Sequence, residues 1–118
     1  MVIKNSILIA LAALLVSNSS FSASQITGGT LYELCRSDDQ YQLGTCDGYI
    51  FGVIDAMHAG HLSNHFAVCM PSGVTAAQLR LSIRKHMEEA PENLQFLADG
   101  KVAEALAKYF PCQQKEEN

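Results

Sequence analysis

The fold is decided by one stretch, Cys46-Asp47-Gly48-Tyr49-Ile50-Phe51-Gly52-Val53-Ile54-Asp55. Apolar residues recur along it every three or four positions, which is the spacing of one face of an α-helix. The members of this face are Cys46, Tyr49, Ile50, Val53, Ile54 and Met57. We expect Gly60 to end the helix, because glycine favours the backbone conformation that closes helices.

A short helix is expected before this stretch. Thr30 and Glu33 have the spacing of a capping box, so the helix should begin there and run to about Cys35. Residues 37–44 are polar and finish in a glycine, which is typical of a loop.

Two more helices are expected after it. Thr75 and Gln78 form a second capping box, and Pro91 fits the first position of a fourth helix that continues to Pro111. Asp99-Gly100 could divide this last helix into two. Strand patterns are nearly absent, so the sequence predicts an all-α fold, a small disulfide-stapled bundle of about four to five helices.

The two ends of the chain are expected to lie outside this bundle. Residues 1–24 have the charge, the apolar run and the small residues of a cleaved secretory signal peptide, with cleavage after Ser22 or Ser24. The apolar run is short for a membrane span, which needs roughly 20 residues, so no membrane segment is expected in the mature form. Residues 25–112 then form one domain, and residues 113–118 form a polar tail that we expect to be disordered.

Four cysteines, Cys35, Cys46, Cys69 and Cys112, lie in the exported part of the chain, where disulfides form. Two disulfides are expected, and three pairings are possible. A short link between consecutive helices would bring Cys35 to Cys46. Pairing Cys46 with Cys69 would instead join opposite ends of a helix roughly 20 Å long, too far for a disulfide. We therefore expect Cys35–Cys46 and Cys69–Cys112.

Small residues recur every four positions along the second helix, at Gly48, Gly52, Ala56 and Gly60. Glycine inside a helix costs roughly 1 kcal/mol relative to alanine, so a closely packed neighbour should offset that cost. This neighbour is either another helix of the same chain or a second copy in a dimer. Phe51 points away from the apolar face, which favours an interface there; burial under the following loop is the alternative.

Several classes of function are disfavoured. The chain has a net charge of −4, whereas nucleic-acid-binding proteins usually present a basic surface. His58, His61 and His65 have a spacing that resembles metal ligands, but Gly60 interrupts the helix that would align them, so no metal or cofactor is expected. The cysteines are expected to be paired and no nucleophile motif is present, so the chain is not expected to be an enzyme.

Several motifs appear together in a fixed order. They are Cys46-x-Gly48-Tyr49-Ile50-x-Gly52-Val53-x-Asp55, Cys69-x-Pro71, Val74-Thr75-x-x-Gln78-Leu79, Pro91-Glu92-x-Leu94 and Phe110-Pro111-Cys112. In this combination the chain resembles the Tai-type immunity proteins of type VI secretion amidase effectors. The resemblance covers nearly all of the expected domain.

The resemblance implies a periplasmic homodimer that inhibits a secreted peptidoglycan amidase by occupying its Cys-His active-site cleft. We expect residues 59–66 to form the inserted loop, with other residues framing it. The predicted partner-binding residues are Phe51, His58, His61, Leu62, Ser63, Asn64, His65, Phe66, Arg80 and Arg84. The alternative function is that of a periplasmic acid-stress chaperone, another small helical disulfide-bonded type.

Overall fold

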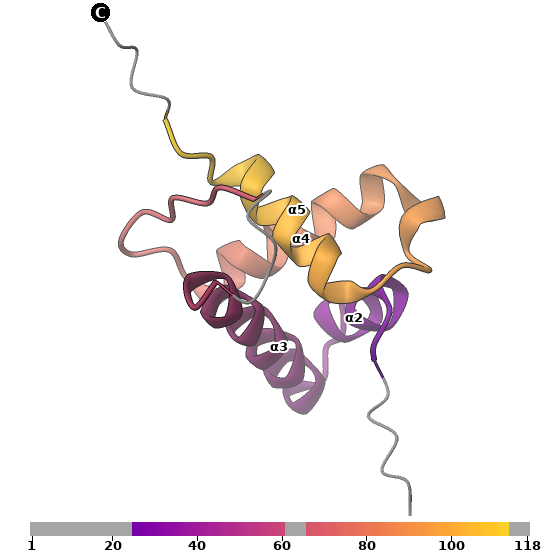
Figure 1. Ribbon diagram of the computed structural model, residues 1–118. Helices are drawn as coiled ribbons and strands as arrows, with labels where there is room; N and C mark the ends of the chain where they lie inside the picture. The colour runs from indigo at the N-terminus through magenta and orange to yellow at the C-terminus, as the bar shows by residue number, and fades with distance from the viewer. Residues whose placement is uncertain (1–24, 61–65, 114–118) are drawn as a thin grey trace, which may run out of the picture.

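A computed structural model describes residues 25–60 and 66–113 (Figure 1). Its helices are α2 (Gly28–Cys35), α3 (Gln40–His58), α4 (Ala76–Glu89), the 3-10 turn η1 (Pro91–Asn93) and α5 (Ala98–Tyr109). Apart from two isolated bridges, no strand pairing occurs in the described ranges, so the predicted all-α bundle is confirmed. The predicted signal peptide and residues 114–118 of the predicted tail lie outside these ranges.

The core lies where the four α-helices meet. Its largest fully buried side chains are Leu31, Cys35, Cys46, Ile50, Leu79, Ile83, Met87, Val102 and Leu106. The predicted apolar face of α3 points into this core: Cys46, Ile50 and Val53 are buried, and the other members pack partly buried around them. Burial of this face is the main stabilising contribution that α3 makes.

Helix α3 begins earlier than expected. Asp39 caps it by accepting a hydrogen bond from the backbone N–H of Gln42 at 2.9 Å. The prediction of a loop over residues 37–44 is therefore wrong from residue 40 onward. Gly44 lies inside α3 instead of closing a loop before it. The Asp39 carboxylate accepts from a free backbone N–H of the first turn, and the glycine costs the helix only about 1 kcal/mol.

Helix α2 also begins earlier than expected. Its cap is Thr27, whose hydroxyl oxygen accepts from the backbone N–H of Thr30 at 3.3 Å, so Thr30 is inside the helix. The predicted cap at Thr30 is wrong. The predicted cap of α4 is confirmed, since Thr75 and Gln78 form both halves of a capping box.

The last helix is divided, but at Leu97 and not at Asp99-Gly100, which lie in the first turn of α5. The expected helix start at Pro91 is only the 3-10 turn η1. The cause is a tertiary contact: residues 26–29 pair with residues 94–98 through three backbone hydrogen bonds of 2.8 to 3.0 Å. With these bonds in place, residues 94–96 form turns and Leu97 is extended, so no continuous helix runs from Pro91 to α5.

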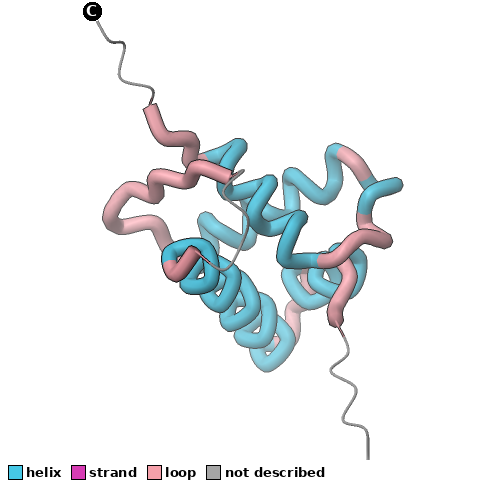
Figure 2. Tube along the Cα trace, in the orientation of Figure 1, coloured by secondary structure: helices cyan, strands magenta, loops and turns pink. Residues whose placement is uncertain are grey.

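Both predicted disulfides are confirmed. Cys35 and Cys46 join α2 to α3 inside the core, with Cα atoms 5.1 Å apart. Cys69 and Cys112 join the long irregular stretch after α3 to the end of α5, with Cα atoms 4.7 Å apart. Figure 2 shows the described part of this stretch, from residue 66 onward, beside the chain that leaves the C-terminal end of α5.

Candidate functional site

The predicted inserted loop, residues 59–66, is only partly described. Five of the predicted partner-binding residues lie outside the described residues, and these are His61, Leu62, Ser63, Asn64 and His65. The described ends of the loop are Gly60, which follows α3 with a backbone φ of 75°, and Phe66. The site can therefore be built only from what surrounds the loop.

An apolar hollow lies where the two ends of this loop meet the bundle. We call it the loop-end pocket; its volume is about 80 Å³, and it is lined by Ile54, Met57, His58, Phe66, Val68, Met70 and Leu106. Three parts of the chain contribute: the last turns of α3, the segment 66–70 and α5. Among the side chains that line this pocket, only that of His58 is polar.

The segment 66–70 is fixed in place at one end of the bundle. The backbone N–H of Cys69 donates to the carbonyl oxygen of Phe110 at 2.9 Å, and Val68 pairs with Pro111 in an isolated antiparallel bridge. The Cys69–Cys112 disulfide closes the same junction. A surface held this way loses little conformational entropy when a partner binds.

A second candidate surface is the outward face of α3. Phe51 is 45% exposed and Tyr41 is 83% exposed. A Cβ atom added at Gly48 or Gly52 would meet no atom within 4 Å. Among the described residues, no helix therefore packs against Gly48 or Gly52.

A shallow groove of about 340 Å³ runs beside this face. It is lined by Gly48, Tyr49, Gly52, Val53, Ala56 and Asp99. Tyr49 and Asp99 are the groove residues with polar side chains. Burial, and after it the nearby Asp99 carboxylate, raises the pKa of Tyr49 above the ordinary value. Gly60, the last member of the predicted small-residue row, lies beyond the end of α3 and does not line this groove.

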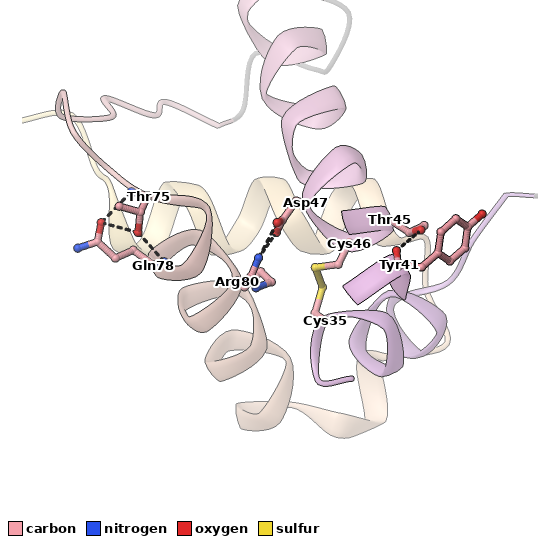
Figure 3. Close-up of polar contacts among 8 residues, drawn as sticks. All are labelled: Cys35, Tyr41, Thr45, Cys46, Asp47, Thr75, Gln78 and Arg80. Carbon is pink, nitrogen blue, oxygen red and sulfur yellow. Dashed lines mark hydrogen bonds and ion pairs between the residues drawn. A yellow bond between two sulfur atoms is a disulfide. The ribbon is translucent and has the colours of Figure 1, made fainter. Parts of the chain in front are cut away.

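The two predicted arginines make contacts within the chain. Arg80 donates to both carboxylate oxygens of Asp47, at 2.6 and 2.5 Å, beside the Cys35–Cys46 disulfide (Figure 3). Along α3, Asp47 lies about 16 Å from His58 at the loop-end pocket. Arg84 lies 3.7 Å from the Glu88 carboxylate, which also accepts a hydrogen bond from the Tyr32 hydroxyl. Arg80 thus links α4 to α3, whereas Arg84 pairs with a residue one turn further along α4. The predicted contact of both arginines with a partner stays a prediction.

Sequence reasoning missed most of the pocket wall. Val68 and Met70 flank Cys69, and their alternation with it is the signal of an extended segment with one side turned to the core. Ile54 and Met57 were recognised as part of the apolar face, but periodicity does not reveal that they remain half-buried at the end of the helix.

The described residues offer little for catalysis. All four cysteines are in disulfides. Within residues 25–60 and 66–113 no three His, Cys, Asp or Glu side chains gather as a possible metal site. The described helices are too short or too polar for a membrane span.

A family model of the Rap1a immunity proteins matches residues 27–112. The chain belongs to the Rap1a immunity protein family. The match takes in the four described α-helices, both disulfides and the loop-end pocket. As a Rap1a family member, the chain is an immunity protein for a secreted effector. The resemblance noted above holds at the level of an immunity-protein family, and the Tai type stays a prediction. No curated protein sequence matches the chain.

Proposed function

We propose that this Rap1a family protein acts in the periplasm, where it binds a type VI secreted peptidoglycan amidase and occludes its Cys-His cleft. The observation that carries the proposal is the loop-end pocket at a fixed end of the bundle. The Cys69–Cys112 disulfide and the Cys69–Phe110 backbone bond hold its wall before any partner arrives. A preformed wall allows tight binding, because little order has to be created on association.

The chemistry of the pocket fits a peptide-like partner surface. Phe66 and His58 lie at its rim, and Val68 and Met70 line it with apolar atoms. Aromatic residues beside a small apolar hollow are common at the centres of protein interfaces. We propose that the predicted inserted loop, residues 59–66, which adjoins the loop-end pocket, enters the effector cleft.

We also propose that two copies pair through the outward face of α3. The glycines at Gly48 and Gly52 leave this face flat and open, and the exposed Phe51 ring lies beside them. Small residues let two helices approach closely, which would offset the helix-weakening effect of the glycines. The variant Gly52→Leu should separate the copies in sedimentation experiments, while Leu81→Ala on α4 should not.

The function is tested by adding the oxidised domain, residues 25–118, to a purified Cys-His amidase and following the cleavage of peptidoglycan. We expect complete inhibition at near-equal molar amounts. Phe66→Ala should weaken inhibition about tenfold, which corresponds to ~1.4 kcal/mol. The matched control is Phe96→Ala, because Phe96 is 53% exposed and does not line the loop-end pocket.

Two outcomes would contradict the proposal. If several such amidases keep full activity and form no complex with the protein, the amidase is not the effector. If Phe66→Ala and Phe96→Ala both leave inhibition unchanged, the loop-end pocket is not the binding surface. The acid-stress chaperone alternative would show instead as binding of an apolar dye and dissociation of the dimer in strong acid.

A further inference from the structure

The two disulfides differ in how a reductant can reach them. Cys35 and Cys46 are 2% and 0% exposed, in the middle of the core. Cys69 is exposed and Cys112 half-buried, at the end of the bundle. Thiol–disulfide exchange requires a thiolate to approach a sulfur atom directly, so exposure controls its rate.

We propose that Cys69–Cys112 is a redox-sensitive clasp that a dithiol reductant opens while Cys35–Cys46 stays closed. In the first step a thiolate of the reductant attacks the sulfur of Cys69, which is the more exposed of the two residues, and Cys112 leaves as a thiolate. The second thiol of the reductant then attacks the mixed disulfide. Cys69 becomes a free thiol, the reductant becomes a cyclic disulfide, and two electrons pass to the protein.

The folded core protects the Cys35–Cys46 disulfide from reduction. A reductant reaches Cys46 only when the bundle opens, and the unfolded fraction of an ordinary protein is on the order of 10⁻³ to 10⁻⁶. The exposed disulfide reacts without this opening. We therefore expect Cys69–Cys112 to be reduced at least about 100-fold faster than Cys35–Cys46 under native conditions.

Reduction of the Cys69–Cys112 disulfide should change the wall of the loop-end pocket. The segment 66–70 is held to the end of α5 by the disulfide, by the Cys69–Phe110 bond and by the Val68–Pro111 bridge. Without the covalent link, two backbone contacts remain between segments far apart in the chain. The wall formed by Val68 and Met70 then loses its fixed position, while the four-helix core keeps its own disulfide.

The functional half of the inference rests on the proposed function. If the pocket wall must be fixed for tight binding, the reduced protein inhibits its effector poorly. The protein would then be a weak inhibitor in a reducing compartment and a strong one after oxidation. This regulation comes from the position of one disulfide and requires no other conformational change in the bundle.

The chemical half is tested first, without any effector. The oxidised protein is treated with dithiothreitol in native buffer, blocked with iodoacetamide at successive times and mapped by peptide mass. We expect the first two labels on Cys69 and Cys112, with helical circular dichroism retained. Labels appearing on Cys35 and Cys46 at a comparable rate would overturn the proposal, as would resistance of all four cysteines.

The functional half uses Cys69→Ser/Cys112→Ser, with Cys35 and Cys46 intact. We expect this variant to stay helical and to inhibit the effector at least tenfold more weakly than the oxidised protein. Normal inhibition by a folded double variant would overturn the regulation and leave the proposed function standing. Failure of the oxidised protein to inhibit any amidase would instead remove the proposed function, with the selective reduction unaffected.

Discussion

Arg80 and Asp47 form an ion pair in which one guanidinium nitrogen donates to both carboxylate oxygens, and this pair ties α4 to α3. The two side chains are 22% and 23% exposed, so solvent screens them less than a surface pair. The Cys35–Cys46 disulfide lies beside them (Figure 3). Helix α3 is therefore joined to α2 by a disulfide and to α4 by an ion pair.

Removing Arg80 should destabilise the isolated protein. Arg80→Ala leaves the Asp47 carboxylate partly buried without its partner, and we expect a loss of about 1–2 kcal/mol in the free energy of unfolding in urea. A double-mutant cycle with Asp47→Asn should give a favourable coupling. The control is Arg36→Ala, because the pair of Arg36 with Glu33 is well exposed and should contribute less. Equal losses in the two variants would contradict this prediction.

Filling the outward face of α3 should stabilise a single copy. Gly48→Ala places a Cβ atom in open space, and we expect a gain of up to about 1 kcal/mol from helix propensity. Gly28→Ala is the opposite control, since its Cβ would lie 3.3 Å from the Leu94 carbonyl oxygen. Thermal unfolding of both variants at a concentration where the protein is monomeric checks the prediction. A lower melting temperature for Gly48→Ala would show that an unseen contact covers this face.

The capping box should make a measurable contribution to α4. The Thr75 hydroxyl accepts from the backbone N–H of Gln78 at 3.2 Å, and the Gln78 amide oxygen accepts from the backbone N–H of Thr75 at 2.8 Å (Figure 3). We expect Thr75→Ala to lower the free energy of unfolding by about 1 kcal/mol. Ser72→Ala, on the exposed turn before the helix, should change it little. Chemical denaturation measures both, and a similar loss at both positions would mean that the cap is not the cause.

Acid should weaken the contact between α4 and α5. Burial raises the pKa of Glu104, but the hydrogen bonds and charges of Lys101 and His86 outweigh burial and set it below the ordinary value of 4.5. Because this pKa is lower in the folded chain, the ionised carboxylate stabilises the fold above pH 4.5. That stability is lost as the pH falls through the folded pKa.

The measurement is the free energy of unfolding between pH 7 and pH 3. Glu104→Gln should flatten the decrease below pH 4.5, whereas Glu92→Gln on the exposed η1 turn should leave it as in the unaltered protein. An identical pH profile for Glu104→Gln and the unaltered protein would rule out this contribution.

Much of the fold could be predicted from local patterns. The buried face of α3 and the capping box of α4 each depend on a few neighbouring residues. The disulfide pairing follows from the length of the helix that separates the cysteines. The start of α3 was missed because residues 40–45 are at most half-buried and show no apolar periodicity. The break at Leu97 was missed because backbone bonds to a segment some 70 positions earlier cause it.

The candidate site was less predictable than the fold. Phe51 lies on the outward face of α3, and His58 and Phe66 line the loop-end pocket. The predicted contact of these three residues with a partner stays a prediction. The role of Arg80 as a link between α4 and α3 depends on which helices become neighbours, and a single sequence does not carry that information. Composition likewise could not reveal that the glycine row of α3 is uncovered, since a glycine row looks the same whether or not a helix packs on it.

The backbone pairing of residues 26–29 with residues 94–98 also bears on the order in which the chain can fold. A ribosome or a translocation pore delivers the chain from its N-terminus, so the first helix emerges long before its hydrogen-bonding partner exists. The α2 end of the bundle cannot close until nearly the whole domain is free. Folding is thus postponed to the moment of release, and a shortened chain that ends before Leu94 should remain open and be a ready target for proteases.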